Sequence, residues 1–202
     1  AKALKAVGFE EGDRIPVFTQ AVPAHFILLL AAERTGACLL CRDDTPDELC
    51  FAIRKTTTDV IFVQDYLSSE DEELIRSTTQ TKRIVKISPY DYADKNCMPD
   101  YVKENISKQY SVDIKNMNGD MTWNEFLELG KSYNGNYMIT PDPDRPVFGA
   151  YTSGSTGVSK LVIHSSANMS ARPTPARRLP RSRRGEESVF LFSFLFLSCF
   201  MV

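Results

Sequence analysis

Hydrophobic residues recur along this chain in short continuous runs, which alternate with longer stretches of helical spacing. Short runs rich in Val, Ile, Leu and Phe are typical of strands that are covered on both faces of a sheet. Such runs predict strands at 15–18, 38–41, 59–63, 83–87, 146–151 and 161–163. Helices are predicted between them, at 1–11 and 24–35, after Thr45, from Ser68 and at 122–129.

Several of these helices have clear start and stop signals. The run 24–35 is apolar nearly all round, which predicts a buried helix that ends at Gly36. Thr45 and Thr122 are predicted as N-caps, because their hydroxyls accept hydrogen bonds from backbone N–H groups. The acids of 68–73 resemble a metal site, but we interpret them as complementing a helix N-terminus and facing water.

The strand–helix–strand order predicts an α/β fold, with a mostly parallel sheet flanked by helices. No GxGxxG motif follows the first strand, so the fingerprint of a Rossmann dinucleotide site is missing. Residues 90–120 are predicted to form a surface excursion with at most a short helix at 101–106. Asp142 and Asp144 lie in a proline-rich linker and are interpreted as turn residues.

Composition excludes some functions. The chain has 202 residues, of which 43% are hydrophobic and 25% charged, and this is typical of one globular domain. A net charge of −2 gives no footprint for nucleic acid. Five cysteines, an odd number, predict reduced thiols and a cytoplasmic location. Cys38 and Cys41 are predicted to be core residues rather than a zinc or redox pair, and His25 a packed or surface residue.

One polar stretch, Tyr-Thr-Ser-Gly-Ser-Thr-Gly-Val-Ser-Lys at 151–160, joins the last two predicted strands. Glycines let successive backbone N–H groups point into one concavity that suits phosphate oxygens, and hydroxyls add donors or Mg²⁺ ligands. The spacing differs from a Walker A loop, since only two residues separate Gly154 from Gly157. The alternative is a solvated hairpin loop without a ligand.

This stretch resembles the phosphate-binding signature of the adenylate-forming superfamily, which includes acyl-CoA synthetases, peptide-synthetase adenylation domains and luciferases. The following run, 163–168, is similar to acetyl- and medium-chain acyl-CoA synthetases, with a histidine at the position of His164. The segments 12–15 and 29–37 also resemble the early part of the family's N-terminal domain. The chain departs from the signature at Ser159 and Leu161, where proline and glycine are usual.

The resemblance implies a ligase that activates a small carboxylic acid with ATP, as in fatty acid metabolism, and transfers it to a thiol. ATP, Mg²⁺ and coenzyme A are the implied cofactors. The implied nucleotide-binding residues are Thr152, Ser153, Gly154, Ser155, Thr156, Gly157, Lys160 and His164, with Thr156 as the Mg²⁺ ligand. Lys160 is an auxiliary charge in this scheme, and His164 is either near the substrate or packed within a strand.

The family's later segments for adenine, ribose and the catalytic lysine are not found in this sequence. We therefore predict a truncated N-terminal domain fragment that is inactive alone, with no catalytic residue assigned. The alternatives are a nucleotide- or phosphate-binding module without catalysis, or a membrane-tethered interaction protein.

Composition changes after residue 170. Residues 171–185 are rich in Arg, Pro and Ser, and 189–202 are almost entirely apolar. A partial AMP-binding domain is therefore predicted at 1–170, and a disordered or aberrant tail foreign to the family at 171–202. A membrane tail and a nucleic-acid arm are the alternatives. The apolar run is shorter than the ~20 residues of a spanning helix, so membrane attachment is not favoured.

Overall fold

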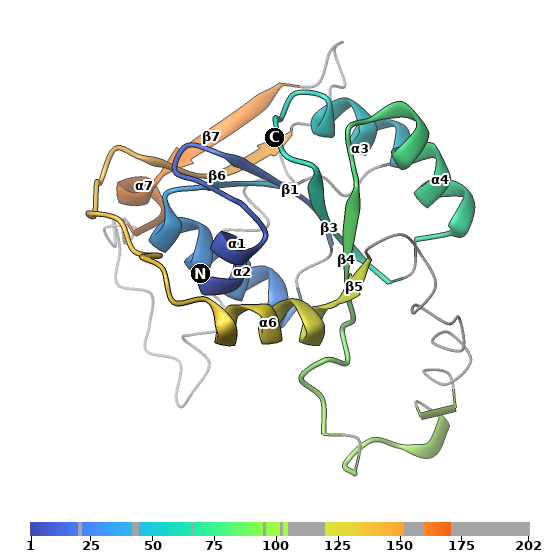
Figure 1. Ribbon diagram of the computed structural model, residues 1–202. Coiled ribbons are helices and arrows are strands. Elements are labelled where there is room, and N and C mark those ends of the chain that lie inside the picture. Colours follow the sequence, from blue (N-terminus) through green and yellow to red (C-terminus); the bar gives the residue numbers. More distant parts are fainter. Residues whose placement is uncertain are drawn as a thin grey trace, which may run out of the picture.

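The computed structural model describes residues 1–19, 22–41, 45–65, 67–94, 96–101, 103–104, 120–151 and 160–170. One seven-stranded sheet runs through them in the order β5-β4-β3-β1-β2-β6-β7 (Figure 1). The strands are β1 (Arg14–Phe18), β2 (Cys38–Cys41), β3 (Val60–Gln64), β4 (Arg83–Ile87), β5 (Met121–Thr122), β6 (Pro146–Tyr151) and β7 (Leu161–Ser165). Neighbouring strands are parallel except for the antiparallel pair β6 and β7, which confirms the predicted α/β sheet.

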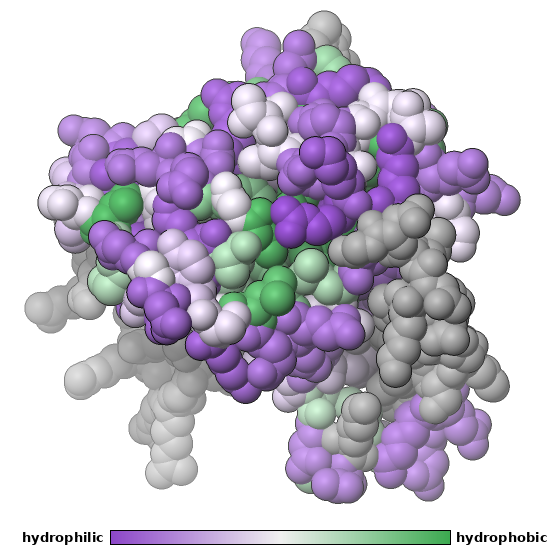
Figure 2. Space-filling model, viewed as in Figure 1, coloured by the Kyte–Doolittle hydropathy of each residue, from purple (hydrophilic) through white to green (hydrophobic). Residues whose placement is uncertain are grey.

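Helices cover both faces of this sheet. They are α1 (Lys2–Ala6), α2 (Pro23–Thr35), α3 (Pro46–Ile53), α4 (Ser69–Thr78), α6 (Trp123–Ser132) and α7 (Ser166–Ser170). Buried side chains of α1, α2 and α6 form one core cluster, and those of α3 and α4 form a second cluster on the opposite face. The outer surface over α6 is mostly hydrophilic, and apolar side chains are visible near the centre of the same face (Figure 2).

The central strand β3 shows why continuous apolar runs became buried strands. All five of its residues are buried. Successive side chains of a strand point to opposite faces. Phe62 accordingly joins the core beneath α1 and α6, while Ile61 and Val63 join the core beneath α3 and α4. Each buried side chain of this size stabilises the fold by about 1.5–3 kcal/mol.

The predicted helix caps are confirmed. The Thr45 hydroxyl accepts a hydrogen bond from the Glu48 backbone N–H. Thr122 forms a reciprocal capping box with Glu125. Gly36 ends α2 in the left-handed region with φ of 79°, and its N–H bonds to the Ala32 carbonyl. These caps fix where the helices begin and end, and so how they meet the sheet.

The prediction that α2 is buried is only partly right. Ala24, Leu28 and Ala32 are buried, but Leu30 is 60% exposed and Ile27 is 39% exposed. A helix covering one face of a sheet buries only the side that contacts the strands, whatever residues lie on its other side. The all-round apolar pattern therefore overestimated the burial of α2.

The expectation that the acids of 68–73 all face water is wrong for Glu72. Its side chain is buried, and its carboxylate lies 2.6 Å from the Lys86 ammonium of β4. Glu70 and Glu73 are exposed as expected, and the Ser68 hydroxyl caps α4 by accepting the Asp71 N–H. The helix periodicity turns Glu72 toward the sheet, where a lysine on β4 compensates its charge.

The short edge strand β5 was not predicted, because two residues give no detectable pattern. Asp120 holds it in place by accepting the Ile84 backbone N–H at 2.8 Å and pairing with Arg76. In the predicted excursion, the Trp123 indole N–H donates to the Tyr92 hydroxyl at 2.7 Å. Of the short helix expected at 101–106, the described residues 101, 103 and 104 are helical.

Candidate functional site

The predicted phosphate-binding loop is carried by the β6–β7 hairpin at one edge of the sheet (Figure 1). Tyr151 at the end of β6 pairs with Leu161 at the start of β7, so the strands predicted on both sides are confirmed. Residues 152–159 lie outside the described residues. The binding roles of Thr152, Ser153, Gly154, Ser155, Thr156 and Gly157, including the Mg²⁺ role of Thr156, therefore stay predictions.

Close packing against β2 anchors the hairpin. Leu40 pairs with Gly149 and Cys41 pairs with Ala150. A Cβ atom added to Gly149 would lie 2.7 Å from Leu40 Cδ2, so the approach of the strands requires glycine there. Because β6 is parallel to β2, the chain leaves Tyr151 at the carboxyl edge of the sheet. Open α/β sheets bind their ligands outside this edge.

The two described site residues occupy different parts of the hairpin. Lys160 is exposed and directly precedes β7, at the loop end. His164 lies four residues further along the strand, which corresponds to ~13 Å. Its ring is partly buried, 6.1 Å from the Phe148 ring and tilted by 39°. This contact favours the packed-strand interpretation of His164, and a role near substrate stays a prediction.

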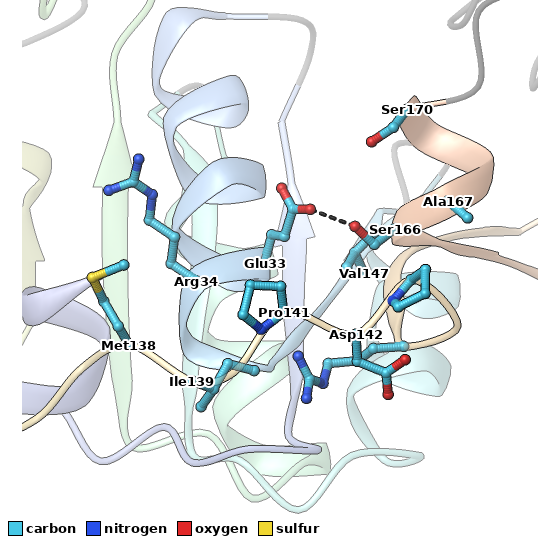
Figure 3. A pocket seen from close by; sticks show the side chains of 12 residues that line it. Glu33, Arg34, Met138, Ile139, Pro141, Asp142, Val147, Ser166, Ala167 and Ser170 are labelled. Atoms are coloured by element: carbon cyan, nitrogen blue, oxygen red, sulfur yellow. Dashed lines mark hydrogen bonds between the residues drawn. The ribbon is translucent and has the colours of Figure 1, made fainter.

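A cavity of about 390 Å³ lies at the other end of the same hairpin (Figure 3). Its walls come from the end of α2, the linker before β6 and the start of α7. Residues lining it include Glu33, Arg34, Ile139, Pro141, Val147 and Ser166. The length of β6 separates this cavity from the predicted loop by about 16 Å. The cavity is therefore not the predicted phosphate site.

Polar contacts fasten the hairpin at the cavity end. The Ser166 hydroxyl donates to the Glu33 carboxylate at 2.5 Å (Figure 3). Arg145 forms an ion pair with Glu11 at 3.0 Å and donates to the Thr140 carbonyl. The Asp142 carboxylate accepts the Asp144 N–H, which confirms the predicted turn. These contacts fix the position from which β6 and β7 run to the loop.

A polar cluster at the carboxyl edge was not predicted. The Thr19 hydroxyl lies 3.0 Å from His25 Nδ1, and Cys41 Sγ lies 3.5 Å from His25 Nε2. Burial lowers the pKa of His25 to about 4, so its ring is neutral at pH 7.

His25 is packed as predicted, and Cys38 is buried as predicted, but Cys41 is only partly buried. The contact between His25 and Cys41 joins residues 16 positions apart in the sequence. Only the knowledge that β1 lies beside β2 would have indicated it.

Within the described part of the chain, no three His, Cys, Asp or Glu side chains are grouped as metal ligands usually are. No described helix has the length and apolar character needed to cross a membrane. None of the four described cysteines is in a disulfide.

A family described as AMP-binding enzyme matches residues 1–200 of this chain. The chain belongs to that family. The match includes residues 171–200, which lie outside the described residues, and the domain boundary predicted at residue 170 stays a prediction.

Curated relatives include acetyl-coenzyme A synthetases. The enzyme named acetyl-coenzyme A synthetase 1 in Kluyveromyces lactis is 29% identical over 170 residues, covering 80% of this chain and 22% of the relative. Acetyl-coenzyme A synthetase of Emericella nidulans is 28% identical over 173 residues, covering 83% and 23%. The predicted similarity to acetyl-CoA synthetases is confirmed, and the chain spans less than a quarter of the length of these relatives.

Solved structures share the fold. The A-PCP didomain of a carboxylic acid reductase from Segniliparus rugosus, in complex with AMP, has a TM-score of 0.57 at 17% identity, covering 83% of this chain and 25% of that chain. Acetoacetyl-CoA synthetase from Streptomyces lividans has a TM-score of 0.55 at 17% identity, covering 81% and 23%. The sheet and its helices therefore correspond to part of the α/β domain of adenylate-forming enzymes.

Proposed function

We propose that this chain supplies the phosphate-binding part of an AMP-forming acid–thiol ligase. In this reaction a carboxylate attacks the α-phosphorus of ATP, which releases pyrophosphate and forms an acyl-adenylate. A thiol then attacks the acyl carbon, AMP leaves, and a thioester forms. One observation carries the proposal: the Tyr151–Lys160 signature joins two paired strands at the carboxyl edge of the sheet, in a chain of the AMP-binding family.

The residues of the signature suit this task by their chemistry. Pyrophosphate gains negative charge as it leaves, and donors already in place stabilise that charge. In our proposal the backbone N–H groups near Gly154 and Gly157 supply such donors. The hydroxyls of Ser153, Ser155 and Thr156 add others, and Thr152 flanks them. Mg²⁺ held by Thr156 would neutralise phosphate charge, and Lys160 would add a positive charge at the loop end.

The names of the relatives favour a small carboxylic acid as substrate and coenzyme A as the thiol. The described thiols, none of them in a disulfide, agree with a cytoplasmic enzyme. No acyl-binding pocket is assigned among the described residues. The substrate class therefore rests on the relatives, and the phosphate site on the signature.

We further propose that the 202-residue chain binds MgATP but does not complete the first step alone. The support is that it covers only 22% and 23% of two acetyl-coenzyme A synthetases that it resembles. Calorimetric titration with MgATP and acetate-dependent ATP–pyrophosphate exchange test the two parts separately. Binding without exchange is the expected result. Absence of MgATP binding would contradict the phosphate site, and robust exchange would contradict the inactivity of the chain.

A further inference from the structure

Three side chains from three elements meet at the carboxyl edge of the sheet. Thr19 follows β1, His25 lies in the first turn of α2, and Cys41 ends β2. The imidazole lies between the hydroxyl and the thiol, with Nδ1 3.0 Å from Thr19 Oγ1 and Nε2 3.5 Å from Cys41 Sγ. A nucleophile within reach of a base that is oriented by a third group is the recurring arrangement of activated thiols.

The environment of His25 determines its protonation. The residue is 1% exposed, and burial lowers the pKa of its imidazole to about 4, so the ring is neutral at pH 7. A neutral imidazole has one N–H and one lone pair. In the tautomer that carries its N–H at Nδ1, Nε2 accepts from the Cys41 S–H and Nδ1 donates to the Thr19 hydroxyl. Cys41 therefore has a proton acceptor in contact with its sulfur.

The other described cysteines lack this arrangement. Burial raises the pKa of the Cys38 thiol to about 11, which suppresses its thiolate. Cys50 is also buried. Cys97 is exposed, and its thiol donates to the Asp94 carboxylate at 3.4 Å. Cys97 is thus a built-in control: it is more accessible than Cys41 but has a carboxylate in place of an imidazole.

We propose that Cys41 is a peroxide-reactive thiol, with His25 as its base and Thr19 as the residue that positions the imidazole. The Cys41 sulfur attacks one oxygen of a hydroperoxide, so that an S–O bond forms while the O–O bond breaks. The thiol proton passes to His25 Nε2 and then to the departing oxygen, which leaves as water or an alcohol. Sulfur is oxidised to a sulfenic acid, the peroxide is reduced, and His25 returns to its neutral form.

Burial of His25 keeps the time that the proton spends on the imidazole short. A buried imidazolium is poorly solvated, so it gives its proton readily to the departing oxygen. The site also has a defined place on the sheet. Cys41 pairs with Ala150 of β6, one residue before Tyr151. Oxidation therefore adds an oxygen atom beside the strand from which the predicted phosphate loop departs.

The test treats the full chain with hydrogen peroxide at pH 7, traps sulfenic acid with dimedone and quantifies each cysteine-containing peptide by mass spectrometry. We expect labelling of Cys41 to be about tenfold faster than that of Cys97, a modest share of what a positioned base supplies. This comparison needs no variant. Equal or slower labelling of Cys41 would overturn the proposal.

Two variants of Thr19 separate positioning from a purely structural role. Thr19→Ser keeps the hydroxyl and is expected to keep the labelling rate, whereas Thr19→Val keeps the shape and is expected to lower it severalfold. His25→Asn is expected to reduce the rate to that of Cys97, with folding checked by circular dichroism. Unchanged labelling in folded His25→Asn, or equal rates in the two Thr19 variants, would contradict the assigned roles.

Discussion

The two ends of the β6–β7 hairpin differ in what holds them. At the cavity end, Glu33, Arg145 and Ser166 join the hairpin to α2 and to the N-terminal segment through exposed polar contacts. At the loop end, the hairpin lies beside β2 and the buried Thr19–His25–Cys41 cluster, at the carboxyl edge of the sheet. The difference indicates that the contacts at the cavity end position the hairpin, while the loop end carries the residues of the proposed phosphate site.

The largest expected effect concerns pH and the buried histidine near the loop end. The pKa of His25 is about 4 in the folded protein, against 6.5 for an ordinary histidine. Between these values the unfolded chain binds the extra proton, so stability falls as pH drops through this window and is unaffected above it. The loss reaches about 3 kcal/mol by pH 4. Urea denaturation from pH 7 to pH 4 measures this loss of stability. In His25→Asn, the part of the pH dependence that is due to His25 should disappear.

The exposed ion pair at the cavity end gives the contrast. Glu11→Gln removes the charge that pairs with Arg145, and we expect the pH dependence of stability to stay nearly that of the wild type. A pH dependence that vanished in Glu11→Gln but persisted in His25→Asn would reverse the comparison between the two ends.

A second prediction concerns the anchoring of the hairpin. Gly149→Ala places a methyl group against Leu40 and Leu161, at distances of 2.7 and 3.1 Å. We expect a loss of about 1–3 kcal/mol, because crowding in a packed region forces neighbouring side chains to move. The midpoint of urea denaturation measures this loss. A variant as stable as the wild type would show that β2 and β6 do not pack as closely as described.

A third prediction concerns charge at the loop end. Lys160→Ala is expected to weaken MgATP binding about fivefold, corresponding to about 1 kcal/mol for an exposed charge. Lys131→Ala is the matched control, since Lys131 is an exposed lysine on α6 paired with Glu128. Calorimetric titration at constant ionic strength measures both. Equal affinities of the two variants would remove Lys160 from the proposed site.

The smallest expected effect is on stability at the cavity end. Glu11→Gln breaks the ion pair with Arg145, in which the Glu11 side chain is 57% exposed. Exposed ion pairs of this kind contribute about 0–1 kcal/mol, so the denaturation midpoint should shift little. MgATP binding should not change. A large loss of affinity would mean that the cavity end, rather than the loop end, governs the ligand.

Local signals in the sequence predicted much of the fold. Thr45, Thr122 and Gly36 marked helix ends because caps act through adjacent residues. The sheet followed from the alternation of strands and helices. The predictions failed where a neighbour distant in sequence decides the outcome. Glu72 is buried because Lys86 of β4 compensates its charge. Leu30 is exposed because only one side of α2 contacts the sheet.

The candidate site divides in the same way. The signature at 151–160 is contiguous, so sequence alone identified it, and its flanking strands are confirmed. The meeting of Thr19, His25 and Cys41 depends on β1 lying beside β2, which no local pattern encodes. The cavity near Glu33 likewise needs three separate segments to be brought together.

The central claim is that the loop end of the hairpin binds the phosphates of ATP. The most direct test follows backbone amide signals by NMR while MgATP is added to the isotope-labelled chain. The account predicts that the amides of Tyr151 and Lys160 shift in a saturable way, while those of Ala167 and Arg145 stay in place. Shifts confined to Ala167 and Arg145, or no shift at any of these four amides, would contradict it.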